Sequence, residues 1–554
     1  MMEVEPTSYA EACKDPRWNQ ACNEELAALE ENQTWEVVKL PEGKKAVGSK
    51  WVFKIKQKSD GTIERFKSRV VAKGYTQIYG IDFLDTYSPV AKINSVKTLL
   101  AVAASKDWHI HQMDVSNAFL HGDLEEEVYL EIPPGANVPR GQGLVYRLKK
   151  SLYGLKQASR QWFAKLTTAL MKNGYSQTSS DYSMFVRWIQ GRIVVVLVYV
   201  DDILIAGSYL GDIEQLKLFL GKEFKVKDLG QMSYFLGLEV LRDHKGISLS
   251  QKKYCLELIT DAGYIEAKGC LSPVDCNLKL TATQGEALPD PTVYRRLIGK
   301  LHYLTITRPD ITYAVQQLAQ FQGTPTVEHL QAAHRVIRYL KHTPGQGLIF
   351  RTDSKLELSG FCDADWASCP DSRKSLTGYC TFLGTSLITW KTKKQTTVSR
   401  SSSEAEYRAL AQVVCEVQWL GNLLLEMGVQ VPLPIPLYCD NKSALHIAEN
   451  PVFHERTKHI ENDCHVTRER LKSGLIKLSH VRTDDQIADI FTKGVTRYRL
   501  KFLLNKLGVF NAYSPACGGY QSRKKTTDFQ QSSAEGASLK IEEETFLPSP
   551  PSDV

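Results

Sequence analysis

The sequence has no apolar run long enough to cross a membrane. The longest candidate, residues 193–200, has eight apolar residues and is followed at once by Asp201 and Asp202, whereas a membrane-spanning helix needs about 20. The first fifteen residues are polar and acidic, so they do not form a secretory signal. We therefore expect neither a membrane span nor secretion, and we take the glycosylation triplets at Asn32 and Asn441 as chance matches.

Paired cysteines are absent as well. The twelve cysteines are scattered singly, with no Cys-X-X-Cys pair and no Cys/His quartet at the spacing of zinc ligands. Cys255, Cys362, Cys380 and Cys439 lie within apolar runs, which is typical of small, reduced core residues. The cysteine pattern therefore argues against both a disulfide scaffold and a zinc-binding domain.

Basic residues gather in three segments, although the net charge is only +7 over 554 residues of ordinary globular composition. Residues 39–73 contain eleven Lys/Arg against three Asp/Glu, residues 294–351 eight against two, and residues 373–400 six against none. One such run is most often a solvated face. Three of them, interleaved with aromatic residues, favour contact with nucleic acid.

Hydrophobic periodicity predicts a mixed order of helices and strands. Helices are expected at 11–35, 95–105, 159–173, 403–427 and 485–507, with others between 291 and 345. Strands are expected as a hairpin over 50–56 and 65–71 that turns at Asp60-Gly61, at 109–120, as an apolar pair over 192–207, as three strands after 351, and at 436–440 and 475–481. The pattern changes near 345–356, where we place a domain boundary.

Three aspartates follow apolar strands and form the first carboxylate group. Asp114 ends one strand, and Asp201 and Asp202 stand 87 residues later at the bend between two others. Any one of them would ordinarily be a turn residue, but a hairpin bend usually carries Asn-Gly or Asp-Gly and not two acids. If the strands lie side by side, the carboxylates converge and bind a hard divalent cation such as Mg²⁺.

Four further acids form a second group in the C-terminal part of the chain. Asp363, Glu406, Asp440 and Asp489 follow one another at spacings of 43, 34 and 49 residues. Glu406 shares a helix face with Leu410, Val413 and Val417, so it is expected to point towards a sheet. A carboxylate on a packed face is costly unless it is paired or bound to metal.

Motifs along the whole chain resemble one family, the copia-type retrotransposon polyproteins, and plant copies in particular. The resemblance spans about residues 7–508 and rests on segments that occur in the family's order: RFKSRVVAKGYTQ, QMDVSNAFLHG, SLYGLKQASRQW, YVDD, YFLGLEV, RRLIGKLHYLTITRPDITYAV, FCDADWA, SSSEAEYRALA, LYCDNKSALHIAENPVFHERTKHIE and QIADIFTKG. It implies an α+β fold, with a right-hand polymerase followed by a ribonuclease H-like α/β domain. The implied divisions are an N-terminal helical segment (1–33), fingers and palm (34–250), thumb or connection (251–350), the ribonuclease H-like domain (351–510) and a disordered tail (511–554).

The resemblance also assigns roles in a polymerase site. Asp114 and Asp201, with Asp202 beside them, resemble the metal ligands of the palm, and Phe119 the aromatic gate that rejects a 2′-hydroxyl, although core packing would also explain it. The residues that resemble a nucleotide-binding set are Lys67, Arg69, Lys73, Val115, Phe119, Tyr153, Gly154 and Lys156, and the primer grip is matched by Phe235, Leu236 and Gly237. Lys227 is either the lysine that protonates pyrophosphate or a solvated side chain. Ser159 departs from the family, which usually has proline there.

In the second group, Asp363, Glu406, Asp440 and Asp489 resemble the four acidic ligands of ribonuclease H. His480 resembles the histidine that helps product release, although a structural histidine would fit that position equally well. Asp365 and Glu404 are the neighbours most easily mistaken for ligands. The family implies two Mg²⁺ ions per site, with Mn²⁺ as a possible replacement.

The implied function is RNA- and DNA-directed DNA synthesis with hydrolysis of the RNA strand of a hybrid. The implied partners are an RNA template, a DNA primer, the RNA–DNA hybrid and dNTPs, in a cytoplasmic particle with access to the nucleus. The protease, integrase and zinc-knuckle signatures of the family are missing, so we expect a C-terminal portion of the polyprotein. The alternative is a degenerate or co-opted copy that binds nucleic acid without catalysis.

Overall fold

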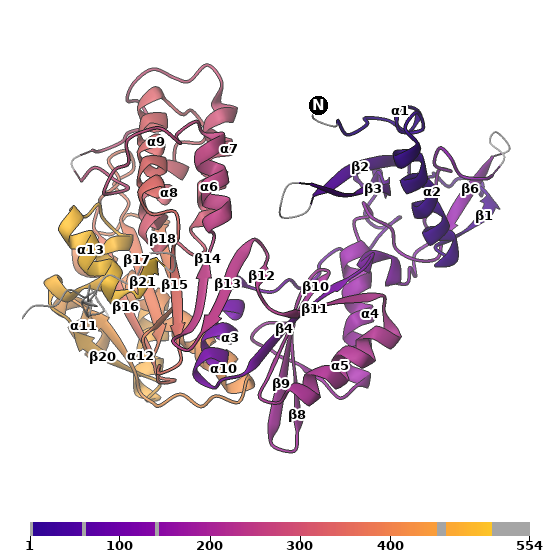
Figure 1. Ribbon diagram of the computed structural model, residues 1–554. Coiled ribbons are helices and arrows are strands. Elements are labelled where there is room, and N and C mark those ends of the chain that lie inside the picture. The colour runs from indigo at the N-terminus through magenta and orange to yellow at the C-terminus, as the bar shows by residue number, and fades with distance from the viewer. Residues whose placement is uncertain (1–3, 58–61, 139–142, 277, 451–460, 512–554) are drawn as a thin grey trace, which may run out of the picture. The chain divides into compact units, whose positions relative to one another are not determined.

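The computed structural model describes residues 4–57, 62–138, 143–276, 278–450 and 461–511 (Figure 1), and these belong to one compact unit. No helix in this part of the chain is both long enough and apolar enough to span a membrane. The residues of the predicted disordered tail, except the first, lie outside the described residues, as does the predicted turn at Asp60-Gly61.

The N-terminal elements are two helices and a two-stranded ribbon. The single helix predicted over 11–35 is wrong: the structure has α1 (Tyr9–Ala12), α2 (Pro16–Glu31) and then β1 (Trp35–Lys39). The break falls before Pro16 because proline has no N–H to continue a helix, whereas Asp15 accepts a hydrogen bond from the N–H of Arg17 and so caps α2. The predicted hairpin is confirmed as β2 (Ser49–Gln57) paired with β3 (Ile63–Ala72).

A six-stranded antiparallel sheet carries the first carboxylate group, in the order β11-β4-β10-β9-β8-β7. Its strands are β4 (His109–Val115), β7 (Ser176–Gln177), β8 (Met184–Ile189), β9 (Arg192–Tyr199), β10 (Asp202–Gly207) and β11 (Val226–Gln231). One face contributes to a core that includes residues of α4 (Ala158–Lys172) and α5 (Leu210–Glu223), and the other to a core that includes residues of α3 (Ile93–Ser105). The apolar strands over 192–207 are therefore buried on both faces, which is why they read as unbroken apolar runs.

Smaller elements connect the ribbon to this sheet. A three-stranded sheet in the order β1-β6-β5 contains β5 (Tyr129–Leu130) and β6 (Leu144–Leu148). Two short 3₁₀ turns, η1 (Gly74–Thr76) and η2 (Ala118–His121), follow β3 and β4. Residues of α2, the ribbon and this small sheet share one hydrophobic cluster.

A third sheet, in the order β12-β13-β14-β15-β21, joins segments far apart in the sequence. Its strands are β12 (Tyr234–Phe235), β13 (Leu238–Asp243), β14 (Gly246–Ser250), β15 (Gln346–Arg351) and β21 (Val509–Asn511). The helices between β14 and β15 are α6 (Lys252–Asp261), α7 (Pro291–Leu304), η3 (Pro309–Ile311), α8 (Thr312–Ala319) and α9 (Val327–His342). The helical character predicted for 291–345 is thus confirmed, and β15 begins immediately after this range.

The C-terminal sheet has the order β18-β17-β16-β19-β20, antiparallel through its first three strands and parallel from β16 to β20. Its strands are β16 (Leu358–Asp365), β17 (Leu376–Leu383), β18 (Ser386–Lys394), β19 (Ile435–Cys439) and β20 (Ile476–His480). Helix α10 (Ser402–Glu426) packs on β16 and β17, and the remaining elements are α11 (Lys442–Glu449), α12 (Glu461–Lys472), η6 (Thr483–Asp485), η7 (Ile487–Phe491) and α13 (Arg497–Lys506).

The helix predicted over 485–507 is wrong in its first half. Residues 487–491 form the 3₁₀ turn η7, and α13 begins only at Arg497, where Thr496 accepts a hydrogen bond from the N–H of Arg499. Gly494 lies between them and packs against Val274 and Cys276. Glycine in a helix interior is destabilising, so Gly494 favours the break.

One hydrophobic core runs through the position of the predicted boundary near 345–356. Strand β15 covers residues 346–351 and pairs with β14 on one side and β21 on the other. The same core includes Leu99 of α3, Phe350 of β15 and Val413 of α10. The two carboxylate groups therefore lie on different sheets of a single packed body.

Candidate functional site

The structure brings the three acids of the first group together at the end of the six-stranded sheet. Asp114 on β4 stands directly opposite Asp202 on β10, and paired residues on adjacent antiparallel strands project from the same face. Asp201 lies in the turn before β10, where its carbonyl accepts a hydrogen bond of 2.9 Å from the N–H of Val115. Two strands and a turn thus hold three carboxylates on a rigid support.

The turn between β9 and β10 has an unusual backbone. Val200 has a φ of 58°, a left-handed conformation that β-branched residues rarely adopt. The indole N–H of Trp162, a buried residue of α4, donates a hydrogen bond of 2.6 Å to the carbonyl of Val200. Trp162 was not singled out from the sequence, although a tryptophan four residues into an otherwise polar helix start is a recognisable signal.

Burial and mutual repulsion raise the pKa values of two of these acids. Burial raises the pKa of Asp202 to about 6; a hydrogen bond from Gln112 opposes the shift, and the charges of Asp201 and Asp114 add to it. Burial also raises the pKa of Asp201, with Asp114 adding to the shift and Arg69 and Lys67 opposing it. Neighbouring carboxylates repel one another, and a bound hard divalent cation would offset that repulsion. The residues present therefore fit Mg²⁺ or Mn²⁺.

A row of contacting side chains connects β3 to this site. The guanidinium carbon of Arg69 lies 4.2 Å from the ring centroid of Tyr153, and that ring lies 4.9 Å from the ring of Phe119. Burial raises the pKa of the Tyr153 hydroxyl to about 12, and Asp201 and Asp114 act on it in the same direction. Arg69, Tyr153 and Phe119 are thus assembled beside the carboxylates, and Phe119 also packs on two hydrophobic clusters.

Gly154 allows β3 and the Tyr153 segment to approach closely. The N–H of Ala72 donates a hydrogen bond of 2.8 Å to the carbonyl of Tyr153. Gly154 has a φ of 91°, and a Cβ added to it would lie 2.1 Å from the carbonyl oxygen of Ala72. Only glycine permits so close an approach of the two backbones.

Three other candidates contact different partners. The ammonium of Lys156 donates a hydrogen bond of 3.1 Å to the carbonyl of Gln77 and lies over the ring of Phe83. Lys73 lies alongside Gly48, whose carbonyl accepts its backbone N–H at 2.8 Å. Val115 has its side chain in the core. The ammonium of Lys156 is therefore directed at Gln77 and Phe83.

Lys227 and the segment Phe235–Gly237 occupy defined positions near β4. Lys227 is exposed on β11 and stands directly opposite Asp114, on the side away from Asp202. Leu236 and Gly237, with φ values of 49° and 74°, form the two-residue turn between β12 and β13. The carbonyl of Leu236 accepts a hydrogen bond from the hydroxyl of Tyr303, and Phe235 is fully buried.

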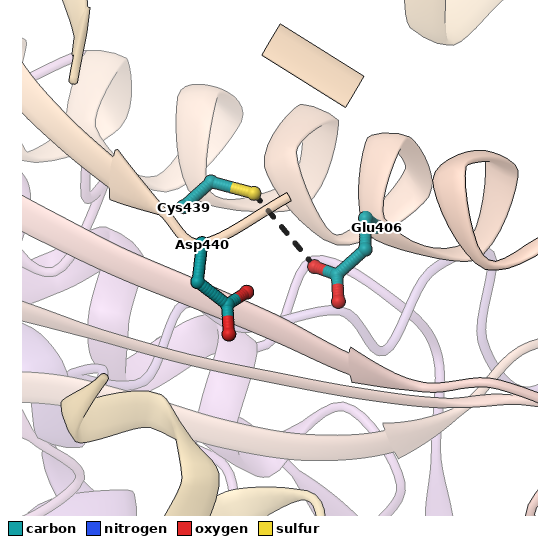
Figure 2. A group of neighbouring side chains, drawn as sticks. All are labelled: Glu406, Cys439 and Asp440. Carbon is teal, nitrogen blue, oxygen red and sulfur yellow. Dashed lines mark hydrogen bonds between the residues drawn. The ribbon is translucent and has the colours of Figure 1, made fainter. Parts of the chain in front are cut away.

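The second carboxylate group lies at the edge of the C-terminal sheet. Asp363 is on β16, Glu406 is on α10, Asp440 follows β19, and Asp489 is in η7. Figure 2 shows Glu406 and Asp440 with Cys439 beside them; one ligand atom of each lies within 4.8 Å of the others. The Sγ of Cys439 lies 3.8 Å from Oε2 of Glu406, a thiol contact that sequence analysis missed because Cys439 was taken as core.

Two cations and a hydroxyl that the sequence analysis missed complete this group. The ammonium of Lys493 lies 2.8 Å from Oδ1 of Asp489 and 3.6 Å from Oδ2 of Asp363, and Arg499 lies 3.2 Å from Oδ2 of Asp489. Thr492 donates a hydrogen bond to Asp363. The spacing of four between Asp489 and Lys493 was the available signal for this ion pair.

Like charges and burial set the protonation of the second group. Burial raises the pKa of Glu406 well above its usual range, and Asp363, Cys439 and Asp440 act in the same direction. Burial raises the pKa of Asp363 to about 6, with Lys493 opposing the shift and Asp489 adding to it. These interactions bring all four predicted acids into one electrostatic cluster, and its oxygen donors fit a hard divalent cation.

Three further candidates lie around this group. Both carboxylate oxygens of Glu404 are engaged, one by the N–H of Arg400 and one by the guanidinium of Arg408. Asp365 lines a cavity of about 210 Å³ together with Lys493. His480 is exposed, and its Nε2 lies 3.1 Å from the carbonyl oxygen of Asp440.

Comparison with known proteins defines the class of this site. Residues 32–276, which contain the ribbon and the first carboxylate group, match the family described as reverse transcriptase (RNA-dependent DNA polymerase). The chain is 43% identical over 516 residues to the retrovirus-related Pol polyprotein from transposon RE2 of Arabidopsis thaliana, covering 93% of this chain and 35% of that protein. It is 38% identical over 518 residues to the Pol polyprotein from transposon TNT 1-94 of Nicotiana tabacum, covering 91% and 39% respectively.

A transposon Ty5-1 protein of Saccharomyces cerevisiae is matched over all of its own length, at 34% identity over 309 residues. The chain belongs to the family of copia-type retrotransposon Pol polyproteins, of which it contains the reverse transcriptase portion. It spans 35–39% of the length of the plant Pol polyproteins that it matches.

Proposed function

We propose that this chain is an RNA- and DNA-directed DNA polymerase that also hydrolyses the RNA strand of an RNA–DNA hybrid. The observation that carries the proposal is the presence of two separate carboxylate groups, each on its own sheet. The substrates would be dNTPs, an RNA or DNA template and a DNA primer, and the right-hand arrangement of fingers, palm and thumb is part of the proposal.

In the polymerase site, Asp114 and Asp201 would hold the divalent cations, with Asp202 beside them. When bound, the cations supply charge stabilisation to an in-line attack of the primer 3′-hydroxyl on the α-phosphate. Arg69 and Lys67 would bind the triphosphate, because their positive charges already act on Asp201. Phe119, which contacts Tyr153, would pack against the sugar and exclude a 2′-hydroxyl.

Lys227 and the turn at Leu236–Gly237 would serve the primer side of this site. Lys227 stands opposite Asp114 and is exposed, so its ammonium is available as a proton donor to the pyrophosphate that leaves. The left-handed turn at Leu236, held by Tyr303, would present backbone groups to the primer strand.

In the second site, Asp363, Glu406, Asp440 and Asp489 would hold cations for hydrolysis of RNA. The strand order of the C-terminal sheet, three antiparallel strands followed by two parallel ones with a helix crossing between β18 and β19, supports a ribonuclease H-like domain. Lys493 and Arg499 would neutralise Asp489 until a cation binds. His480, exposed next to Asp440, would assist product release.

The competing function is binding of nucleic acid by a copy that has lost catalysis. Every acid of the two sites is in place, which favours catalysis. The decisive experiment is extension of oligo(dT) on poly(rA) in Mg²⁺, with cleavage of a labelled RNA–DNA hybrid measured in parallel. Activity that a chelator removes and Mg²⁺ restores supports the proposal, whereas tight binding of the hybrid without either reaction would overturn it.

A further inference from the structure

Lys493 lies between two acids of the second carboxylate group. Its ammonium is 2.8 Å from Oδ1 of Asp489 and 3.6 Å from Oδ2 of Asp363, and the side chains of these acids are only 9% and 3% exposed. A divalent cation held by the same two carboxylates would come close to this ammonium, and like charges at short distance repel strongly. Lys493 and a divalent cation therefore compete for the same pair of acids.

The backbone of Lys493 is fixed, whereas its side chain can move. The N–H of Lys493 donates a hydrogen bond of 3.1 Å to the carbonyl of Asp489, and the side chain is 41% exposed. Arg499, which also pairs with Asp489, is held more firmly, because its guanidinium donates to the carbonyls of Thr483 and Gln486 at 3.0 and 3.2 Å. Of these two cations, Lys493 is thus the one that is displaced more easily.

A cavity of about 210 Å³ beside the acids offers the displaced side chain a second position. Lys493 lines this cavity together with Asp365, Asp275 and Tyr313. Asp365 lies two residues after Asp363 on β16, so the two carboxylates project from the same face of the strand. The ammonium can therefore leave Asp363 and still pair with a carboxylate.

We propose that Lys493 is an internal cation that a divalent metal ion must displace, and that Asp365 receives its ammonium across the cavity. The inference rests on the proposed ribonuclease function and extends it to the loading of that site with metal. The exchange replaces one ion pair by another and makes or breaks no covalent bond. It sets the Mg²⁺ concentration at which the second site fills, whereas the first site, with Asp114 and Asp202 on another sheet, is unaffected.

The first test measures Mg²⁺ binding without catalysis. Thermal melting is followed over a Mg²⁺ titration with and without Lys493→Gln, in an Asp114→Asn background, so that the signal comes from the second site. Without Mg²⁺, the Lys493→Gln variant should melt at a lower temperature, because Asp363 and Asp489 have lost the cation that they share. Its half-saturating Mg²⁺ concentration should fall about tenfold, because the metal ion no longer displaces an ammonium.

RNA cleavage and primer extension on one labelled hybrid assign the effect to one site. In Lys493→Gln, the Mg²⁺ concentration for half-maximal cleavage should fall about tenfold, and that for half-maximal extension should stay unchanged. Lys493→Arg keeps the charge, so both concentrations should stay within about threefold of those of the unaltered chain. Lys501→Gln is the matched control, because Lys501 is an exposed lysine of α13 and its loss lowers the net charge equally.

Asp365→Asn tests the acid that receives the ammonium. Without this carboxylate the displaced ammonium loses its second partner, so the half-saturating Mg²⁺ concentration should rise about threefold. In the Lys493→Gln background the same change should have no effect, because residues that act together are not additive. If Asp365 instead acted on the metal ion through its own charge, Asp365→Asn would weaken Mg²⁺ binding equally in both backgrounds, which would overturn its assigned role.

The failures are distinguishable. If the unaltered chain cleaves no RNA while melting shows the expected competition, the proposed ribonuclease function falls and the inference stands for metal binding alone. If the unaltered chain cleaves RNA but Lys493→Gln leaves the half-saturating Mg²⁺ concentration unchanged or raises it, only the inference is overturned. A melting temperature that Mg²⁺ does not change overturns both. Should Lys493→Gln fail to fold by circular dichroism, Lys493→Met, which keeps the apolar stem, carries the same expectations.

Discussion

At the scale of single residues, the site is defined by acids whose charges are left close together and by the few groups that offset them. Asp114 and Asp202 stand opposite one another on paired strands, and Asp201 precedes β10 in a strained turn. Such an arrangement is unfavourable for the free protein and favourable once a divalent cation is bound. The predictions at this scale test that difference.

We expect Asp114→Asn or Asp201→Asn to abolish nucleotide addition and to leave affinity for the template–primer nearly unchanged. The affinity should come from lysine and arginine contacts to phosphates, whereas the aspartates hold the cations. Primer extension and a filter-binding assay on the same preparation measure the two properties. Extension within about tenfold of the unaltered chain in either variant would contradict the site.

The raised pKa of Asp202 predicts a pH-dependent stability. Because its folded pKa of about 6 lies above the ordinary value of 3.8, the proton binds more tightly in the folded state. The stability that this proton binding adds is fully present below pH 3.8 and is lost as the pH rises through about 6. We therefore expect Asp202→Asn to stabilise the metal-free protein by on the order of 1 kcal/mol near pH 8 and hardly at all near pH 4.

Thermal melting with a chelator present measures this difference. Added Mg²⁺ should stabilise the unaltered chain and reduce the advantage of the Asp202→Asn variant. If Asp202→Asn changed the melting temperature equally at both pH values, Asp202 would contribute to stability through packing and not through charge.

We expect Phe119→Ala to admit ribonucleotides with little loss of dNTP incorporation. The Phe119 ring contacts Tyr153 next to the carboxylates, so its removal opens space on the sugar side of the site. The ratio of rNTP to dNTP incorporation on one template is the measurement. Because Phe119 also packs on two clusters, a general loss of activity with an unchanged ratio would assign it to packing.

At the scale of elements, the strands that carry the acids were predictable and their supports were not. The apolar runs over 109–115 and 192–207 specify buried strands by themselves, and the acids end or interrupt those runs. The helical face of Glu406 likewise follows from its spacing to Leu410, Val413 and Val417, all of which are buried. These features depend on local periodicity, which a sequence displays directly.

The supports depend on tertiary contacts that no local pattern reveals. Trp162 holds the turn at Val200 from another element, and Lys493 reaches Asp363 across 130 residues of chain. The direction of Lys156 is a similar case, because its motif places it near the nucleotide whereas its ammonium bonds to Gln77. Sequence reasoning therefore identified which acids lie together better than it identified the groups that orient them.

We expect Trp162→Phe to weaken the turn that carries Asp201 and Asp202. Phenylalanine fills much of the same buried space but cannot donate to the carbonyl of Val200, so that oxygen loses its partner. The expected cost is about 1–3 kcal/mol of unfolding free energy, with a larger relative loss of extension than of hybrid cleavage. Chemical denaturation and the two activity assays measure it, and an equal loss of both activities would point to general destabilisation.

At the scale of the whole molecule, two sites share one packed body. The side chain of Lys97 on α3 lies 3.4 Å from the ring centroid of Trp390 on β18, and Glu416 on α10 accepts hydrogen bonds from both Asn94 and Tyr379. Helix α3 therefore contacts both the sheet of the first carboxylate group and the C-terminal sheet. The two sites can act independently even though the elements that carry them pack together.

We expect Asp440→Asn to reduce RNA cleavage by several orders of magnitude while DNA synthesis stays within a few-fold of the unaltered chain. The variant removes one ligand of the second site and leaves Asp114 and Asp201 untouched, and distant sites couple weakly. One labelled hybrid reports both extension and RNA fragments. Loss of both activities in a protein that is still folded by circular dichroism would contradict the two-site arrangement.

The position of β21 has a consequence for the order in which the molecule can be made. Strand β15 lies between β14 and β21, so residues 509–511 complete a sheet that begins at residue 234. During synthesis, the ribosome releases residues 234–351 long before their last neighbour emerges, and until then β15 presents an open edge. A nascent chain therefore acquires its complete third sheet only after residues 352–508 have been translated.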